Sequence, residues 1–192
     1  ASLMCGSTTG NATKMLGRAT DWHNLFAAGA GNSSRGNKNF GVANPNAEGY
    51  TNRTVQNGFD GYSYDKNNFE PGDKDKGRLS RAIYYMTVMY NENVLDTKNN
   101  VNMKPLKVVD EYVNYVAGDD CAFAIGNGQT LFQWAHRDVD LLEYQHNEAV
   151  FSYKFEGKTA QGNRNPFIDH PEYACKIWGT YNSNTRRVCG IK

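Results

Sequence analysis

One segment constrains the fold more than any other: Gly77–Tyr90, which reads GRLSRAIYYMTVMY. Its larger apolar side chains recur every three or four residues, a spacing that places them on one side of an α-helix. These residues are Leu79, Ile83, Met86 and Tyr90. A stretch with strong helix breakers, EPGDKDKG, leads into the segment. The pattern predicts a long helix at the centre of the core.

The start of this predicted helix carries two cations, Arg78 and Arg81. The N-terminal end of a helix bears a partial positive charge, so cations are disfavoured there. We therefore expect an anion or an acidic partner nearby.

Shorter elements are expected elsewhere. In DWHNLFAA, Trp22, Leu25 and Phe26 form an i, i+3, i+4 apolar face, which predicts a helical turn with Asp21 as its N-cap. Residues 61–77 read as a loop. The apolar run of residues 106–118 is compatible with either a helix or a strand.

The C-terminal third is expected to be helical. Residues 128–157 contain at least one long helix with a break near Asp138, and residues 170–179 form a final short helix with Pro171 in its first turn. The candidate core positions between them are Leu131, Trp134, Leu141, Leu142, Tyr144 and Val150. Together the segments predict a mostly helical fold with irregular segments and a small hairpin.

Composition limits the class of protein. The 192 residues are 39% hydrophobic and suit one domain spanning 1–192, and no internal repeat or linker is visible. No apolar run approaches the ~18 residues of a membrane-spanning helix, so no membrane partner is expected. A formal net charge of +1 does not indicate a nucleic-acid binder, although a local cluster of cations suffices for one.

The four cysteines are Cys5, Cys121, Cys175 and Cys189. None forms a Cys-x-x-Cys pair, so a zinc cluster is not expected. In an oxidising compartment Cys175 pairs with Cys189 across a turn-rich run, and Cys5 with Cys121. Four buried thiols in a cytosolic protein are the alternative.

A candidate site lies in the N-terminal third. Asn32 and Arg35 follow the DWHNL block closely, which places oxygen ligands and a cation in one segment. Magnesium takes oxygen ligands and keeps several waters, so one or two protein ligands suffice. Arg35, Arg78, Arg81 and Arg164 stand in Gly- or Asn-rich surroundings, where they are candidates to bind a phosphodiester.

Three blocks in this order, DWHNLFAAGAGNSSRGNKNFG, KGRLSRAIYYM and QGNRNPFIDHPEYACKIW, resemble the endonuclease I family. The resemblance implies a secreted or periplasmic, monomeric α+β protein with a small ββα-metal (His-Me finger) motif. It also implies that the protein cleaves DNA, and often RNA, with little sequence preference and with one divalent metal, usually Mg²⁺.

The resemblance also assigns roles to residues. Asn32 matches the metal-binding asparagine, and Arg35 follows it as in the family. His23 and Asn24 match the Asp-x-His-Asn-Leu block and support the site from behind. Arg35, Arg81 and Arg164 are the expected phosphate contacts, while Asn163–Asn165 are expected to brace the site loops.

The family's general-base histidine lies upstream of this block, in a Glu-His pair. No histidine or glutamate precedes His23 in this chain. We therefore expect a motif that is incomplete at its N-terminus, and little or no nuclease activity from these 192 residues alone. The alternatives are a non-catalytic nucleic-acid-binding relative and an extracellular carbohydrate-binding module.

Overall fold

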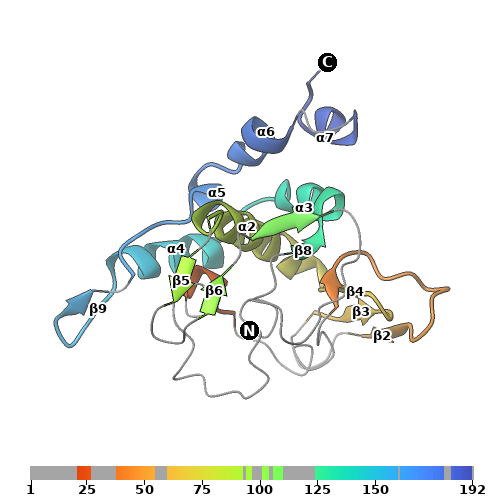
Figure 1. Ribbon diagram of the computed structural model, residues 1–192, viewed down its shortest axis with the longest axis horizontal. Helices are drawn as coiled ribbons and strands as arrows, with labels where there is room; N and C mark the ends of the chain where they lie inside the picture. The colour runs from red at the N-terminus through yellow and green to blue at the C-terminus, as the bar shows by residue number, and fades with distance from the viewer. Residues whose placement is uncertain are drawn as a thin grey trace.

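The computed structural model describes residues 21–26, 38–54, 60–92, 94–96, 101–103, 106–109, 124–159, 161–179 and 183–191. These ranges form an α+β fold in which helices surround a central helix and a small mixed sheet lies at one end (Figure 1). The expected α+β class is confirmed at this level. The predicted ββα-metal motif depends on residues 27–37, which lie outside the described residues.

Helix α2 (Asp73–Met89) runs through the middle of the molecule and confirms the predicted central helix (Figure 1). It begins earlier than predicted, at Asp73, because Asp73 and Asp75 in its first turn suit the positive end of the helix dipole. Ile83 and Met86 are buried, and Leu79 and Tyr90 pack partly buried against the same cluster.

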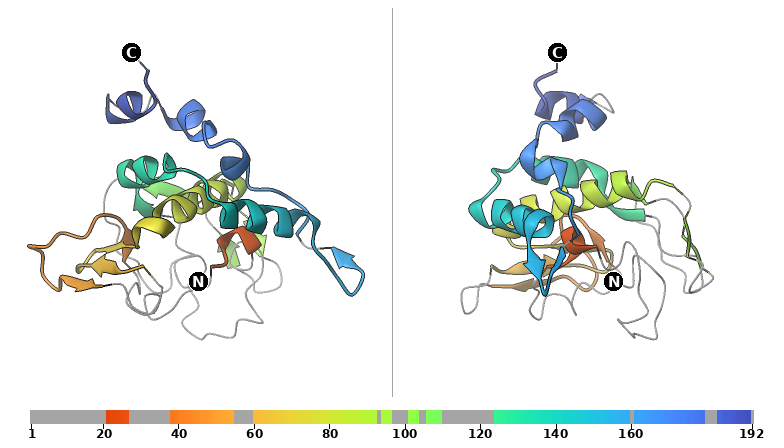
Figure 2. Two further views of the ribbon diagram at one scale, coloured as in Figure 1. Left: turned by 180° about the vertical axis from the view of Figure 1, so that it is seen from behind. Right: turned by 90° about the vertical axis from the view of Figure 1, so that its left-hand side faces the viewer.

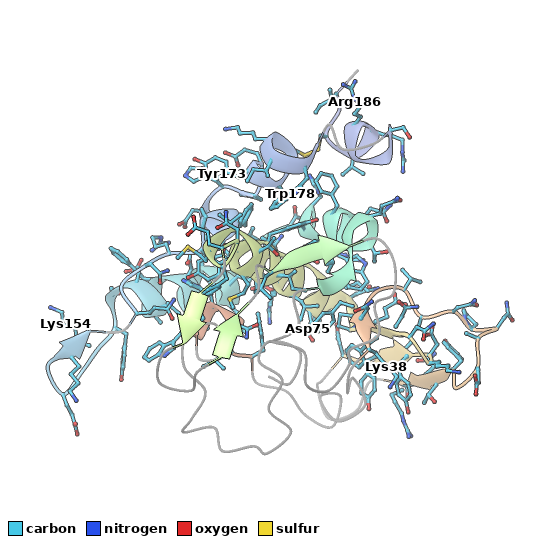
Figure 3. The ribbon with its side chains drawn as sticks, in the orientation of Figure 1. Lys38, Asp75, Lys154, Tyr173, Trp178 and Arg186 are labelled. Carbon is cyan, nitrogen blue, oxygen red and sulfur yellow. A yellow bond between two sulfur atoms is a disulfide. The ribbon has the colours of Figure 1, made fainter. Side chains whose placement is uncertain are left out.

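The hydrophobic core forms where α3 (Gly128–Ala135) and α5 (Pro166–Asp169) pack against α2. Helix α6 (Tyr173–Trp178) closes it from above, where Trp178 stacks on Tyr84 with ring centroids 4.4 Å apart (Figure 3). The buried core residues are Ile83, Tyr84, Tyr85, Met86, Leu106, Leu131, Phe132, Trp134, Ala135, Phe167 and Ala174.

The sheet has the strand order β1 (Asn39–Phe40), β4 (Asn68–Glu70), β3 (Tyr62–Tyr64), β2 (Thr51–Arg53). Strand β1 pairs with β4 in parallel, whereas the other two pairings are antiparallel. The prediction of a loop over residues 61–77 is therefore wrong, since that stretch holds β3, β4 and the start of α2.

The turn between β3 and β4 explains this error. The Asp65 carboxylate accepts hydrogen bonds from the backbone N–H groups of Asn67 and Asn68, both at 2.7 Å, and from that of Asn44 at 2.8 Å. Such aspartate turns reverse the chain between strands, so the same polar residues that suggest a loop also make the hairpin.

Helix α4 (Leu141–Ser152) follows α3 after a break that contains Asp138, as predicted. Of the predicted core positions, Leu131, Trp134 and Val150 are buried. The prediction was wrong for three residues on α4, which are largely exposed: Leu141, Leu142 and Tyr144. The inner side of α4 instead buries Glu143 and Asn147.

Short strands complete the described structure. Strand β7 (Lys107–Val109) pairs in parallel with β8 (Ala124–Asn127), so the ambiguous run begins as a strand, and residues 110–123 lie outside the described ranges. Strands β5 (Val94–Asp96) and β6 (Val101–Met103) pair antiparallel.

A second hairpin, β9 (Lys154–Phe155) with β10 (Lys158–Thr159), follows α4. It projects from the end of the molecule opposite the sheet (Figures 1 and 2). Its two turn residues have left-handed backbones, with φ of 49° at Glu156 and 75° at Gly157. This turn suits the twist of a two-residue hairpin, and glycine takes such a conformation without strain.

The C-terminal region contains two helices that the sequence did not predict, α5 and α7 (Ser183–Val188). The predicted final helix is α6, and Pro171 lies just before it rather than in its first turn. Cys175 and Cys189 form the predicted disulfide. Cys5 and Cys121 lie outside the described residues, and their predicted pairing stays a prediction.

Candidate functional site

The DWHN block is a 3-10 turn, η3 (Trp22–Asn24), which is anchored to α2 through Asp21. Asp21 caps it as predicted, because its Oδ1 accepts from the His23 backbone N–H at 2.9 Å. Its Oδ2 accepts from the hydroxyl groups of Tyr85 at 3.0 Å and Tyr90 at 2.9 Å. The buried Asp21 carboxylate therefore serves to position the turn.

The predicted apolar face of this turn is not buried. Trp22, Leu25 and Phe26 are 42%, 52% and 44% exposed, whereas His23 is 2% exposed. A single 3-10 turn presents its side chains differently from an α-helix, so the i, i+3, i+4 rule does not select the buried residue.

His23 lies between the DWHN block and the QGNRN run. Its Nε2 is 3.2 Å from the Asn163 carbonyl oxygen, so this nitrogen carries the hydrogen and donates it. Its Nδ1 is buried and finds no hydrogen-bond partner among the residues that the structure describes. Burial lowers the pKa of His23, and the ring packs edge-on against Tyr85 with centroids 4.5 Å apart.

Tyr85 joins the two blocks. While its hydroxyl donates to Asp21, it accepts from Asn163 Nδ2 at 2.6 Å and from Gln161 Nε2 at 3.2 Å. Gln161 Oε1 in turn accepts from the Trp22 backbone N–H at 2.8 Å. Burial and the Asp21 charge raise the pKa of Tyr85, which keeps its hydroxyl protonated.

The end of the QGNRN run is held by two buried asparagines. The Asn165 backbone N–H donates to Asn147 Oδ1 at 2.7 Å, and Asn165 Nδ2 donates to the Arg81 carbonyl at 3.2 Å. Asn165 Oδ1 accepts from the Phe167 backbone N–H and so caps α5. These contacts have the form expected of a brace.

Arg81 is a buried structural residue in this fold. It is 1% exposed and ion-paired with Glu143, and its Nε lies 2.8 Å from Glu143 Oε1. Nη1 and Nη2 donate further to the carbonyls of Ala135, Arg137 and Asp138. All five N–H donors are thus used, which leaves none for the expected phosphate contact.

The acidic partner expected near the start of α2 is present. Glu143 pairs with Arg81, and Asp140 pairs with Arg78. Gly77 makes room for the first pair, because a Cβ there would lie 2.6 Å from Arg81 Nη2. A helix-interior glycine, which costs about 1 kcal/mol relative to alanine, is thereby explained.

Arg164 faces two carboxylates. Its Nε and Nη2 bind Asp169 at 2.8 and 2.7 Å, and its Nη1 binds Glu148 at 2.5 Å. Its side chain is 32% exposed. The bidentate contact with Asp169 raises the pKa of Arg164 and favours a bracing role over a phosphate contact.

Several residues that the sequence did not single out contribute to this site. His146 on α4 lies 3.0 Å from the Trp22 carbonyl through Nε2, and its ring stacks on Phe26. Tyr90 and Gln161 also contact the η3 turn or its cap. Gln161 belongs to the QGNRN block, so the family resemblance was a signal for it, whereas no local pattern indicated His146 or the hydroxyl of Tyr90.

Of the three remaining predicted site residues, Asn24 lies in the described part of the chain. Asn24 is half-buried at the end of η3, and its backbone N–H donates to the Asp21 carbonyl at 3.0 Å. Asn32 and Arg35 belong to residues 27–37, outside the described part of the chain. Their predicted roles are untested.

In the described part of the chain, the carboxylate beside η3 is already used by the protein. The nearest carboxylate to η3, Asp21, already accepts from three protein donors. In the described ranges, one group of three potential metal ligands comes together. It consists of His136, Cys175 and Cys189. Magnesium prefers oxygen ligands, so this group does not suit it.

The family model for endonuclease I matches residues 3–172, and so spans the DWHN block, α2 and the QGNRN run. The chain belongs to the endonuclease I family. The match ends before Cys175, so α6, α7 and the disulfide lie beyond the part of the chain that the endonuclease I model covers.

Two curated relatives agree with this membership. The chain is 34% identical over 174 residues to an extracellular ribonuclease of Bacillus amyloliquefaciens, covering 88% of this chain and 50% of that protein. It is 32% identical over 164 residues to an extracellular ribonuclease of Bacillus subtilis (strain 168), covering 84% and 48%. The chain thus spans about half the length of these relatives.

No solved structure matches it. No helix in the described residues has the length and apolar character to cross a membrane.

Proposed function

We propose that this chain forms the scaffold of a secreted, magnesium-dependent nuclease that hydrolyses phosphodiester bonds of RNA and DNA with little sequence preference. One observation carries the proposal. Two of the blocks that resemble the endonuclease I family, DWHN and QGNRN, meet at the hydroxyl of Tyr85, a residue of the third block, and at the contact from His23 to Asn163.

This network fixes the start of the segment that carries the remaining candidates. Because α2 and the QGNRN run hold Asp21 and His23, the position of η3 is fixed. Residues 27–37 follow η3 closely in the chain. We assign Asn32 as a ligand of Mg²⁺ and Arg35 as the contact to the scissile phosphate. Bound Mg²⁺ would stabilise charge on the phosphate and the leaving oxygen.

His23 and Asn24 act in this proposal as positioning residues. The Nε2 hydrogen of His23 is donated to a backbone carbonyl, and its ring is buried. A histidine held in this way fixes the turn and does not reach solvent to take a proton from water.

RNA is included because both curated relatives are named extracellular ribonucleases. Their names also support secretion, and the Cys175–Cys189 disulfide fits an oxidising compartment.

The test measures cleavage of labelled RNA and supercoiled plasmid by the protein in the form in which the cell makes it, with Mg²⁺ and with EDTA. We expect cleavage of both substrates that EDTA abolishes and that Asn32→Ala and Arg35→Ala reduce. His170→Ala is the matched control, because this exposed side chain contacts Glu172 and Tyr173. The 192-residue chain is assayed beside it, and robust cleavage by that chain would contradict the expected inactivity.

Two outcomes would overturn the proposal. Salt-dependent nucleic-acid binding by a folded protein without cleavage would identify a non-catalytic binding relative. Neither binding nor cleavage, with affinity for a polysaccharide, would favour the carbohydrate-binding alternative.

A further inference from the structure

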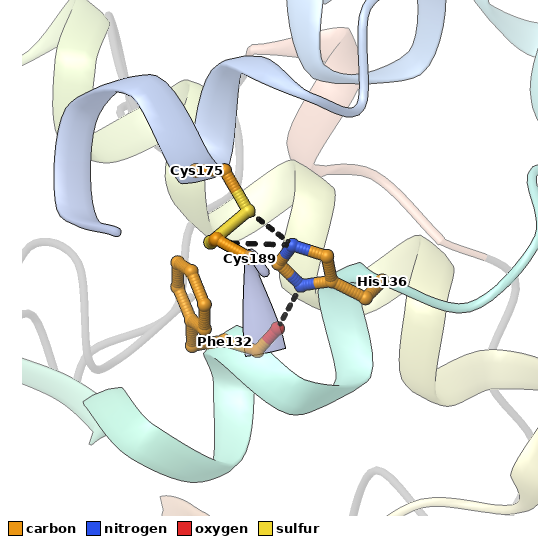
Figure 4. The surroundings of a disulfide bond; sticks show 4 residues. All are labelled: Phe132, His136, Cys175 and Cys189. Atoms are coloured by element: carbon orange, nitrogen blue, oxygen red, sulfur yellow. Dashed lines mark hydrogen bonds between the residues drawn. A yellow bond between two sulfur atoms is a disulfide. The ribbon is translucent and has the colours of Figure 1, made fainter. Parts of the chain in front are cut away.

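The disulfide Cys175–Cys189 lies against a histidine. His136 follows α3, Cys175 lies on α6 and Cys189 follows α7, so three separate segments bring their side chains together (Figure 4). The ligand atoms of the three residues lie within 4.8 Å of one another. Their wide spacing in the chain explains why no zinc motif is visible in the sequence.

The orientation of His136 is set by its other ring nitrogen. Nδ1 lies 2.7 Å from the Phe132 carbonyl oxygen, which accepts a hydrogen bond, so in the tautomer that can bind a metal Nδ1 carries the hydrogen. Nε2 then presents its lone pair to Cys175 Sγ at 2.8 Å and lies 4.0 Å from Cys189 Sγ. A disulfide sulfur bears no hydrogen and cannot donate to this lone pair.

This arrangement is characteristic of a metal-binding histidine. Such residues almost always donate one ring N–H to a carbonyl or carboxylate, which fixes the ring and directs the other nitrogen at the metal. We propose that, once the disulfide is reduced, His136, Cys175 and Cys189 form a binding site for Zn²⁺.

The backbone needs little adjustment for this change. The two Cα atoms are 5.6 Å apart. Two thiolates that bind one tetrahedral Zn²⁺ at about 2.3 Å have sulfur atoms about 3.8 Å apart, a separation that side-chain rotation reaches from the disulfide. His136 is exposed and both cysteines are half-buried, so an ion from solvent can reach the sulfur atoms.

Reduction of the disulfide is a thiol–disulfide exchange. A dithiol reductant attacks one sulfur through its thiolate, and the resulting mixed disulfide resolves to give the oxidised reductant and the free thiols of Cys175 and Cys189. Zn²⁺ then binds both sulfur atoms and releases two protons to solvent. Three protein ligands leave a fourth position for water, as in open zinc sites.

Co²⁺ serves as the spectroscopic probe for Zn²⁺ in the test. The full chain is reduced, freed of reductant without air and titrated with Co²⁺, and circular dichroism confirms that it stays folded. We expect a sulfur-to-cobalt charge-transfer band that is absent from the oxidised protein and that Zn²⁺ removes by competition. The Cys175→Ser/Cys189→Ser variant reports any binding by Cys5 and Cys121, and we expect it to lack the band.

His136→Ala decides whether the histidine is a ligand. It keeps both cysteines and alters an exposed side chain, so folding is preserved. We expect it to bind Co²⁺ more weakly by more than about tenfold, whereas His170→Ala binds as the native chain does. Equal Co²⁺ affinity in His136→Ala, or no band in the reduced native chain, would overturn the proposal. So would loss of helical structure on reduction that Zn²⁺ does not restore.

Discussion

The Tyr85 hydroxyl donates a hydrogen bond to Asp21 Oδ2 at 3.0 Å, and through it α2 holds the turn that begins the candidate site. Because the same oxygen accepts from Asn163 and Gln161, one phenol joins three polar side chains, of which Asp21 is buried, Asn163 half-buried and Gln161 exposed. Tyr85→Phe keeps the ring packing but removes one hydrogen bond from each of these three side chains, although Asp21 Oδ2 still accepts from Tyr90. We expect it to lower the free energy of unfolding by about 2–3 kcal/mol, measured by urea denaturation.

Tyr90→Phe is the matched control for Tyr85→Phe. Its hydroxyl also donates to Asp21, at 2.9 Å, but it does not join the QGNRN run in the contacts described above. We expect a loss of about 1 kcal/mol. Equal losses in the two variants would show that Tyr85 is not the junction.

The second prediction concerns the buried pair of Arg81 and Glu143. Arg81→Met leaves the Glu143 charge buried without its partner, so we expect a loss of about 3–5 kcal/mol in the free energy of unfolding. The double variant Arg81→Met/Glu143→Leu removes both charges and should recover much of that loss. A stable Arg81→Met protein with weakened nucleic-acid binding would instead make Arg81 a phosphate contact.

The third prediction separates bracing from phosphate binding at Arg164. Arg164→Ala removes its contacts with Asp169 and Glu148. Because the side chain is partly exposed, we expect a loss of about 1 kcal/mol, with RNA affinity by fluorescence anisotropy unchanged. Weaker RNA binding at unchanged stability would contradict the bracing role. Glu148→Gln, which keeps the arginine, is the control.

The fourth prediction is a pH dependence caused by His23. Burial lowers its pKa in the folded protein below the ordinary value of 6.5, so the unfolded chain binds the proton more readily. The stability that the folded protein gains by burying a neutral His23 is complete above pH 6.5. It is lost as the pH falls from 6.5 toward the pKa of His23 in the folded protein. His23→Gln should flatten the stability profile in that window, and His170→Gln should not. A native profile that is flat between pH 6.5 and the acid transition would contradict the burial of a neutral imidazole.

Periodicity predicted α2, the break between α3 and α4, and part of the core, because these depend on apolar side chains at regular spacing. It failed for Leu141 and Leu142, which are exposed, while Glu143 on the same helix is buried. Glu143 is buried because it forms an ion pair with the buried Arg81. No local sequence pattern reveals a partner that lies on another helix.

The candidate site was harder to predict for the same reason. The sequence identified His23 and Asn163 by resemblance, but the contact between them joins residues 140 positions apart. Tyr85 belongs to the hydrophobic core cluster, and no sequence pattern indicates that its hydroxyl contacts three polar side chains. The sequence also did not show that Arg81 is buried, because its partner Glu143 lies 62 positions away.

The β9–β10 hairpin has a practical consequence for handling this protein. Its tip, Glu156–Gly157, stands away from the body of the molecule and contributes no residue to the core cluster. Exposed tips of this kind are where proteases cut and where inserted sequence is tolerated. A purification tag or fluorophore placed between β9 and β10 would leave both the DWHN turn and the QGNRN run untouched. The chain could equally be cut there, because α4, which precedes the cut, packs against α5, which follows it.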